Sequence, residues 1–221
     1  KAYSARGAST GALHLDANEN PWSPPPSTAA VKDYNRYPAQ QPPGLRQRLA
    51  DLYGVMPNEI AMGRGADEAI DVIVRAFCEP GKDKILLATP TFSFFNTVAS
   101  LNGCDVIDVK SGADLRPDMD VVVKRVSDDQ PKVTFLCSPN NPTGMSIDKV
   151  DILRVCEVSN GLVVLDEAYI EFSSEESLAA QRPENLIVTR TLSKLYALAG
   201  VRRGAAIADP AVIDLMLKVI P

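Results

Sequence analysis

Short apolar, mostly β-branched runs alternate with amphipathic segments along most of this chain, and that alternation constrains its fold more than any other feature. The strand-like runs are Lys84–Ala88, about Asp105–Val109, Val133–Cys137, Leu162–Leu165, Leu186–Thr189 and Ala205–Ala208. Helical spacing is found near Gly44–Gly54, Gly65–Phe77, Phe94–Leu101, Ile147–Val158 and Ala211–Ile220. Strands that alternate with helices predict an α/β fold with a mainly parallel central sheet.

The N-terminal part of the chain breaks this pattern. Its prolines forbid long helices, and they are Pro21, Pro24, Pro25, Pro26, Pro38, Pro42 and Pro43. We therefore predict an N-terminal arm over residues 1–43 and one globular domain over residues 44–221. The stretch Ser111–Val126 shows no clear pattern and is left unassigned.

Composition and charge exclude several classes of function. The net charge of −5 makes a nucleic-acid partner unexpected. No apolar run reaches the roughly 18–20 residues that a membrane-spanning helix needs. His14 is the only histidine, which leaves no multi-histidine metal site within one chain, and we predict no metal. The four cysteines show no CxxC spacing, which favours reduced thiols and a cytoplasmic location.

Polar motifs follow three of the predicted strands, where ligands of open α/β sheets bind. They are Ser138–Gly144 (SPNNPTG), Asp166–Tyr169 (DEAY) and Arg190–Lys194 (RTLSK). Taken one at a time, the motifs could equally be a plain turn, a solvated acidic loop and a basic surface loop.

A fourth segment, Gly65-Ala66-Asp67, opens a predicted helix. Free backbone N–H groups and the positive end of the helix dipole favour a phosphate there. Arg202, eight residues beyond Lys194, adds a guanidinium suited to the same anion. The segment is neither a Walker motif nor a complete GxGxxG, and alone it would be an ordinary helix start.

Together these segments resemble the fold-type-I enzymes that use pyridoxal 5′-phosphate (PLP), the class I/II aminotransferases, and most closely the histidinol-phosphate aminotransferases. The matching stretches are Leu15–Trp22, Asn35–Pro43, Gly63–Phe77, Cys137–Gly144, Asp166–Phe172 and Arg190–Arg202. The resemblance implies a three-layer α/β/α large domain. It also implies a small C-terminal domain that is absent from this chain, so we expect a fragment.

The resemblance also implies roles for individual residues. Lys194 would form the imine with PLP and later move a proton, and Asp166 would face the pyridine nitrogen. Asn141 and Tyr169 would hydrogen-bond the phenolic oxygen. The phosphate would be held by Ala66, Asp67, Ser193 and Arg202, with Thr191 as a further contact.

Three further residues carry expectations of their own. Phe92 would stack on the cofactor ring where near relatives often have tyrosine, although it could equally be a core aromatic. Tyr53 matches a tyrosine that reaches the phosphate of the neighbouring subunit, which implies a homodimer. The arm resembles a lid over the substrate, which Asn20 would approach together with Asn141.

The resulting functional hypothesis is a ping-pong aminotransferase acting on L-histidinol phosphate and 2-oxoglutarate. An aromatic aminotransferase or a threonine-phosphate decarboxylase shares these motifs and is the first alternative. The second alternative belongs to another class, a PLP-binding fragment without catalysis.

Overall fold

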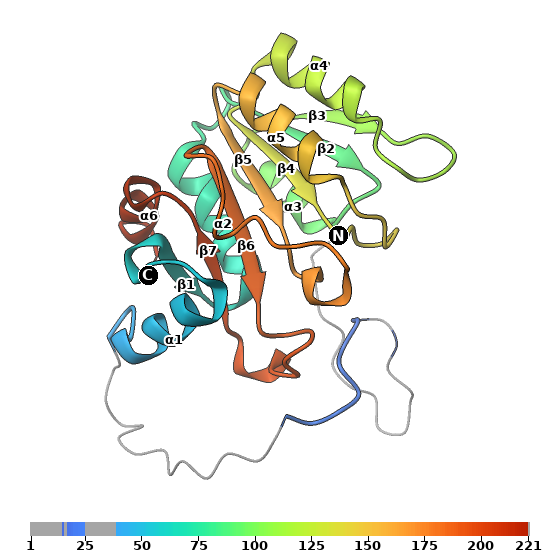
Figure 1. Cartoon of the computed structure of the whole chain (residues 1–221). Helices are drawn as coiled ribbons and strands as arrows, with labels where there is room; N and C mark the ends of the chain where they lie inside the picture. Colours follow the sequence, from blue (N-terminus) through green and yellow to red (C-terminus); the bar gives the residue numbers. More distant parts are fainter. Residues whose placement is uncertain (1–14, 16, 25–38, 221) are drawn as a thin grey trace.

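The computed structural model describes residues 15, 17–24 and 39–220, and one sheet dominates this part of the chain (Figure 1). Its seven strands lie in the order β1-β7-β6-β5-β4-β2-β3. They are β1 (Ile60–Gly63), β2 (Lys84–Thr89), β3 (Asp105–Lys110), β4 (Val133–Cys137), β5 (Leu162–Asp166), β6 (Leu186–Thr191) and β7 (Gly204–Ile207). Pairing is parallel from β6 to β3, and β7 is antiparallel to β1 and to β6. The mainly parallel sheet is thus confirmed.

Helices cover both faces of the sheet and complete three layers. The α-helices are α1 (Pro43–Tyr53), α2 (Gly65–Phe77), α3 (Phe94–Leu101), α4 (Met119–Asp129), α5 (Lys149–Val158) and α6 (Pro210–Leu217). Buried side chains of α1, α4 and α5 form one apolar cluster with the sheet, and those of α2, α3 and α6 form a second. The α/β/α architecture is therefore confirmed. No helix in the described ranges is long and apolar enough to cross a membrane.

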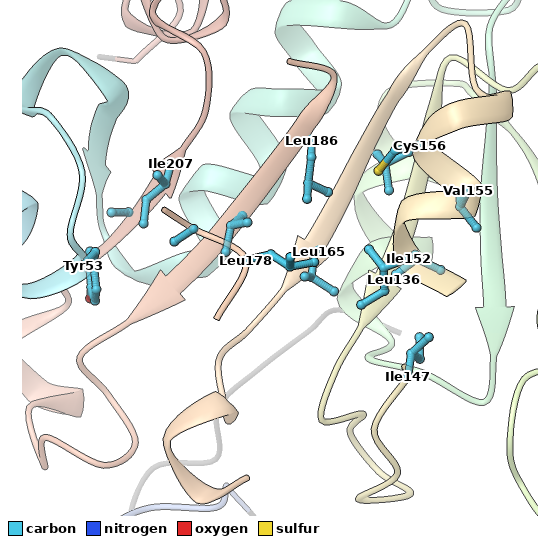
Figure 2. Close-up of a cluster of buried hydrophobic side chains, with 14 of the residues drawn as sticks. Tyr53, Leu136, Ile147, Ile152, Val155, Cys156, Leu165, Leu178, Leu186 and Ile207 are labelled. Carbon is cyan, nitrogen blue, oxygen red and sulfur yellow. The ribbon is translucent and has the colours of Figure 1, made fainter. Parts of the chain in front are cut away.

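The strands are apolar on both faces because both faces are covered. On β4, Leu136 belongs to the cluster beneath α1, α4 and α5, whereas its neighbour Phe135 belongs to the opposite one. Figure 2 shows part of the first cluster, in which Leu165 and Leu186 line up between Tyr53 and Ile152. This double burial accounts for the uninterrupted apolar runs, which differ from the alternation of a sheet with one wet face.

The structure adds two elements that the patterns did not predict. Strand β1 has only four residues and pairs with β7 at the edge of the sheet. Helix α4 begins within the unassigned stretch and continues to Asp129. Its N-terminus is capped by Asp118, whose carboxylate accepts hydrogen bonds from the amides of Asp120 and Val121. Most of its side chains face solvent, and only Val122 and Val126 are buried, which explains the weak pattern. Helix α1 ends at Gly54, which adopts a left-handed conformation as expected.

Candidate active site

The carboxyl ends of β4, β5 and β6 lie side by side, so the motifs that follow them meet. Cys137 pairs with Asp166, and Asp166 pairs with Thr189. The Asp166 side chain is 3% exposed and accepts hydrogen bonds from the Thr189 hydroxyl at 2.9 Å and from the Ala168 amide at 3.2 Å. Burial raises the pKa of Asp166 to about 6, against the opposing effect of these two hydrogen bonds.

Lys194 belongs to the loop after β6 and approaches the same place. Its Nζ atom lies 5.5 Å from the centre of the Tyr169 ring and donates a hydrogen bond to the Ala17 carbonyl at 2.8 Å. Burial lowers the pKa of the Lys194 amine, while the carboxylates of Asp67, Glu19 and Asp166 raise it and Arg202 lowers it further. The amine therefore lies within the electrostatic reach of Asp166, as predicted from the strand ends.

An anion pocket forms beside the amine at the N-terminus of α2. Arg202 donates from Nη2 to the Asp67 carboxylate at 3.1 Å and from Nη1 to the Ser193 hydroxyl at 3.5 Å. The Thr191 hydroxyl donates to Ser193 at 3.0 Å. No described side chain caps the first turn of α2, so its amide donors remain oriented toward this group of residues. A guanidinium, two hydroxyls and a helix N-terminus suit a phosphate.

Two glycines let the backbone come close at this pocket. Gly65 has a φ of +81°, and a Cβ atom there would lie 2.8 Å from Nη2 of Arg202. A Cβ atom on Gly204 of β7 would lie 2.5 Å from the Ala66 amide nitrogen and 2.5 Å from the Gly65 carbonyl carbon. Only a residue without a side chain allows β7 to support the start of α2 at this distance.

We expect Gly204→Ala to destabilise the chain by about 1–3 kcal/mol. The new methyl group would overlap backbone atoms, which cannot move aside by a side-chain rotation. Urea unfolding of both proteins measures the difference in unfolding free energy. Gly200→Ala is the matched control, since nothing lies within 4 Å of its Cβ position, and it should change stability by less than about 0.5 kcal/mol. Equal stability of the two variants would contradict this reading of the contact.

The described arm segment 17–24 runs past the loops that follow β5 and β6, and it contacts the loop that carries Lys194 (Figure 1). Asn18 donates a hydrogen bond to the Tyr169 hydroxyl at 3.1 Å. Asn20 donates to the backbone carbonyl of Leu195 at 3.0 Å and to that of Lys194 at 3.4 Å. Within the described residues Ala17 and Asn20 thus contact Lys194, whereas residues 1–14, 16 and 25–38 lie outside the described residues, and the lid over the substrate stays a prediction. The approach of Asn20 to a substrate stays a prediction.

The other predicted contacts lie nearby without reaching the amine. Burial and the charge of Asp166 raise the pKa of the Cys137 thiol, and a hydrogen bond from the backbone N–H of Asn141 lowers it. Phe92 is half-buried and packs edge-on against Phe95, with ring centres 5.6 Å apart. This packing agrees with the core interpretation, and ring stacking on a cofactor stays a prediction.

Tyr53 occupies a different environment from the one expected. Its side chain is 7% exposed, and its hydroxyl is buried with no hydrogen-bond partner among the described residues. The Arg190 guanidinium carbon lies 4.6 Å from the ring centre. Within this chain the hydroxyl is therefore buried beside Arg190, and its contact with a neighbouring subunit stays a prediction.

Three functional contacts escaped the sequence reasoning. Thr189 holds the Asp166 carboxylate, Asn18 holds the Tyr169 hydroxyl, and Asn140 holds the turn after β4. The Asn140 amide donates to the Pro90 carbonyl at 2.8 Å, and its oxygen accepts from the Thr91 hydroxyl at 2.9 Å. The signal available for the first was that Thr189 and Asp166 both lie at the ends of predicted strands. The other two contacts join residues far apart in the chain and left none.

The family model described as aminotransferase class I and II matches residues 10–221, which is nearly the whole chain. The chain belongs to this family. The fold of this chain is also similar to that of solved aminotransferase structures. The chain superimposes on a crystal structure of histidinol-phosphate aminotransferase from Sinorhizobium meliloti in complex with pyridoxal-5′-phosphate, with a TM-score of 0.83 and 28% identity. That alignment covers 91% of this chain and 57% of the other.

Curated members of the family are more similar in sequence. The histidinol-phosphate aminotransferase of Christiangramia forsetii is 40% identical over 95% of this chain and 58% of its own length. That of Pectobacterium atrosepticum is 42% identical over 95% of this chain and 59% of its own length. This aminotransferase-family chain thus spans somewhat more than half the length of the curated relatives it matches.

Proposed function

We propose that this chain contributes the cofactor-binding part of a PLP-dependent histidinol-phosphate aminotransferase, which transfers the amino group of L-histidinol phosphate to 2-oxoglutarate. One observation carries the proposal. The Lys194 amine, the buried Asp166 carboxylate and the pocket of Arg202 and Ser193 gather at one edge of the sheet. The names of the curated relatives support the choice of substrate.

The residues present fit the chemical groups of PLP. Arg202, Ser193, Thr191 and the open first turn of α2 supply donors for its phosphate. Asp166 would pair with the pyridine nitrogen, since it takes part in no ion pair among the described residues and a buried carboxylate gains most from a positive partner. Tyr169 and Asn141 would donate to the phenolic oxygen, and Phe92 would line the ring. Ala66 and Asp67 would contribute backbone N–H groups to the phosphate.

The chain's own side chains then prepare proton transfer at one atom. PLP, when bound, supplies the aldehyde that accepts an amino group and the ring that stabilises negative charge at the substrate Cα. The lowered pKa of Lys194 increases the fraction of neutral amine near neutral pH, which an amine that takes up a proton requires. The arm residues 17–20 cover this amine and limit the access of water.

Uptake of PLP by the purified chain tests the proposal. We expect a visible absorbance band on mixing, and borohydride reduction followed by peptide mapping should leave the cofactor mass on Lys194. Addition of L-histidinol phosphate should then discharge the band, whereas release of carbon dioxide from threonine phosphate would favour the decarboxylase alternative. A chain that takes up no PLP would exclude the proposed function, and one that binds PLP but reacts with no amino donor would be a binding fragment.

Arg202→Met should weaken PLP binding about tenfold to a hundredfold, because one charge-assisted hydrogen bond to the phosphate is lost. Fluorescence titration gives the dissociation constants. Pyridoxal, which lacks the phosphate, should bind both proteins alike, and Arg203→Met serves as the neighbouring control. Equal loss of affinity for PLP and pyridoxal would show that Arg202 supports the fold of the pocket rather than the anion.

We also propose a cytoplasmic homodimer. The four cysteines are free and buried, which fits a reducing compartment. The half-exposed edge of the site, with Leu195 at 42% and Val201 at 57% exposure, offers apolar surface for a second subunit. Sedimentation of the longer protein tests the dimer.

A further inference from the structure

Arg190 is a buried charge that the proposed chemistry leaves unused. It lies in β6, four residues before Lys194, and its side chain is 6% exposed. Along β6 the side chains alternate, so Thr189 points to the face that holds Asp166 while Arg190 points to the opposite face, toward Tyr53 on α1. A guanidinium is costly to bury, and its partners show what it holds in place.

The side-chain hydrogen-bond partners of Arg190 among the described residues come from the segment that follows β5. Its Nη2 atom donates to Glu171 at 2.7 Å, and its Nη1 atom donates to the Ser177 hydroxyl at 3.0 Å and approaches Glu167 at 3.4 Å. Glu167 in turn accepts from the Ser177 hydroxyl at 2.5 Å and from the Leu178 amide at 2.9 Å. Asp166 directly precedes Glu167 and Tyr169 lies between the two glutamates. The arginine therefore holds both ends of the turn that carries Asp166 and Tyr169.

A second link ties this turn to the loop of Lys194. Burial and the neighbouring carboxylate of Glu171 raise the pKa of Tyr196, two residues beyond Lys194, so this tyrosine lies beside the glutamate that Arg190 binds. The two loops therefore meet through one carboxylate. Because a salt bridge with good hydrogen-bond geometry restricts both partners, movement of either loop would break contacts that leave buried charges unpaired.

We propose that Arg190 is a positioning residue, which through Glu171, Glu167 and Tyr196 fixes the turn of Asp166 and Tyr169 against the loop of Lys194. The inference deepens the proposed function, because it rests on Lys194 being the reactive amine. Its direct consequence concerns the environment of that amine. Loss of Arg190 would loosen the cover over Lys194, and water would then stabilise the charged ammonium.

The test measures the reactivity of Lys194 in the cofactor-free chain. Reductive methylation over a range of pH, quantified at the Lys194 peptide by mass spectrometry, gives the pH at which labelling is half-maximal. In Arg190→Met this midpoint should rise by about one pH unit, because burial is the largest cause of the lowered pKa of Lys194. The groups that face the amine, Asp67, Glu19, Arg202 and Asp166, are unchanged in the variant.

Arg182→Met is the matched control. Arg182 is also a buried arginine, it pairs with Glu59 at 2.8 Å, and its Nε atom lacks a partner within the described residues as that of Arg190 does. It contacts the Ala208 carbonyl, beyond the end of β7 that lies away from Lys194. We expect a comparable loss of stability but an unchanged labelling midpoint. In Arg190→Lys the labelling midpoint should rise less than in Arg190→Met, since the positive charge is kept.

Two results would overturn the inference. One is an Arg190→Met midpoint equal to that of the unaltered chain, and the other is an equal shift in Arg182→Met. If Arg190→Met does not fold, Tyr196→Phe decides, because it removes only the hydroxyl that joins the loops; an unchanged midpoint there also refutes the proposal. PLP uptake by the unaltered chain is measured separately, so failure of the proposed function is distinguishable from failure of this inference.

Discussion

Replacing Lys194 by alanine will leave no cofactor mass attached to the chain after reduction with borohydride, because no other described amine lies beside Asp166 and Tyr169. The rate of amino-group transfer should fall by about 10²–10⁴-fold from loss of the general base alone. Stopped-flow absorbance after mixing with PLP and amino donor measures the rate, and peptide mapping locates the cofactor.

Two control variants sharpen the Lys194 result. Lys194→Arg keeps the positive charge but cannot serve as the amine, so it should be as inactive as Lys194→Ala. Lys82→Ala removes an exposed lysine that pairs with Glu79 and should leave both readouts unchanged. Cofactor attached to a different lysine in Lys194→Ala would contradict the assignment.

Asp166→Asn should have opposite effects on stability and on function. In the cofactor-free chain, burial raises the folded-state pKa of Asp166 to about 6 from its ordinary value of 3.8. A raised carboxyl pKa means that its contribution to stability is complete below the unfolded pKa and is lost as pH rises toward the folded value. That loss is about 2 kcal/mol between pH 4 and pH 7. The variant lacks this penalty, so it should be the more stable protein at pH 7.

Urea unfolding at several pH values checks this prediction. The difference in unfolding free energy between Asp166→Asn and the unaltered chain should change by about 2 kcal/mol from pH 4 to pH 7. Asp105→Asn, at an exposed position, should show no such change. PLP-dependent activity of Asp166→Asn should fall at the same time, which is the usual exchange of stability for function at an active site. A difference that does not vary with pH would show that Asp166 is already ionised in the folded chain.

Much of the architecture could be predicted from local patterns. A strand buried on both faces must be apolar throughout, and for that reason β4, β5 and β6 were recognisable as runs of consecutive residues. The polar residues after them could be located because parallel strands end at a common edge. Lys194, Asp166 and Arg202 were found in this way, together with the resemblance to a known family.

Contacts between distant residues could not be predicted in that way. Asn18 and Tyr169 are 151 residues apart, and nothing near either residue indicates the other. Tyr53 was expected to reach a neighbouring subunit, and nothing in its local sequence indicates that its ring would be 7% exposed and packed against Arg190. Arg190 itself could only be interpreted as part of a basic loop. Its burial depends on the carboxylates of Glu167 and Glu171, which follow the neighbouring strand β5.

The amino-acid sequence by itself determined which segments become strands and helices and which chemical groups stand at the strand ends, because both depend on spacing along the chain. The tertiary structure alone decided that β7 runs antiparallel, that the arm covers Lys194, and that Arg190 joins two loops. These features arise from burial and charge pairing between segments remote in sequence, and the free energy of such contacts exists only once the chain has folded.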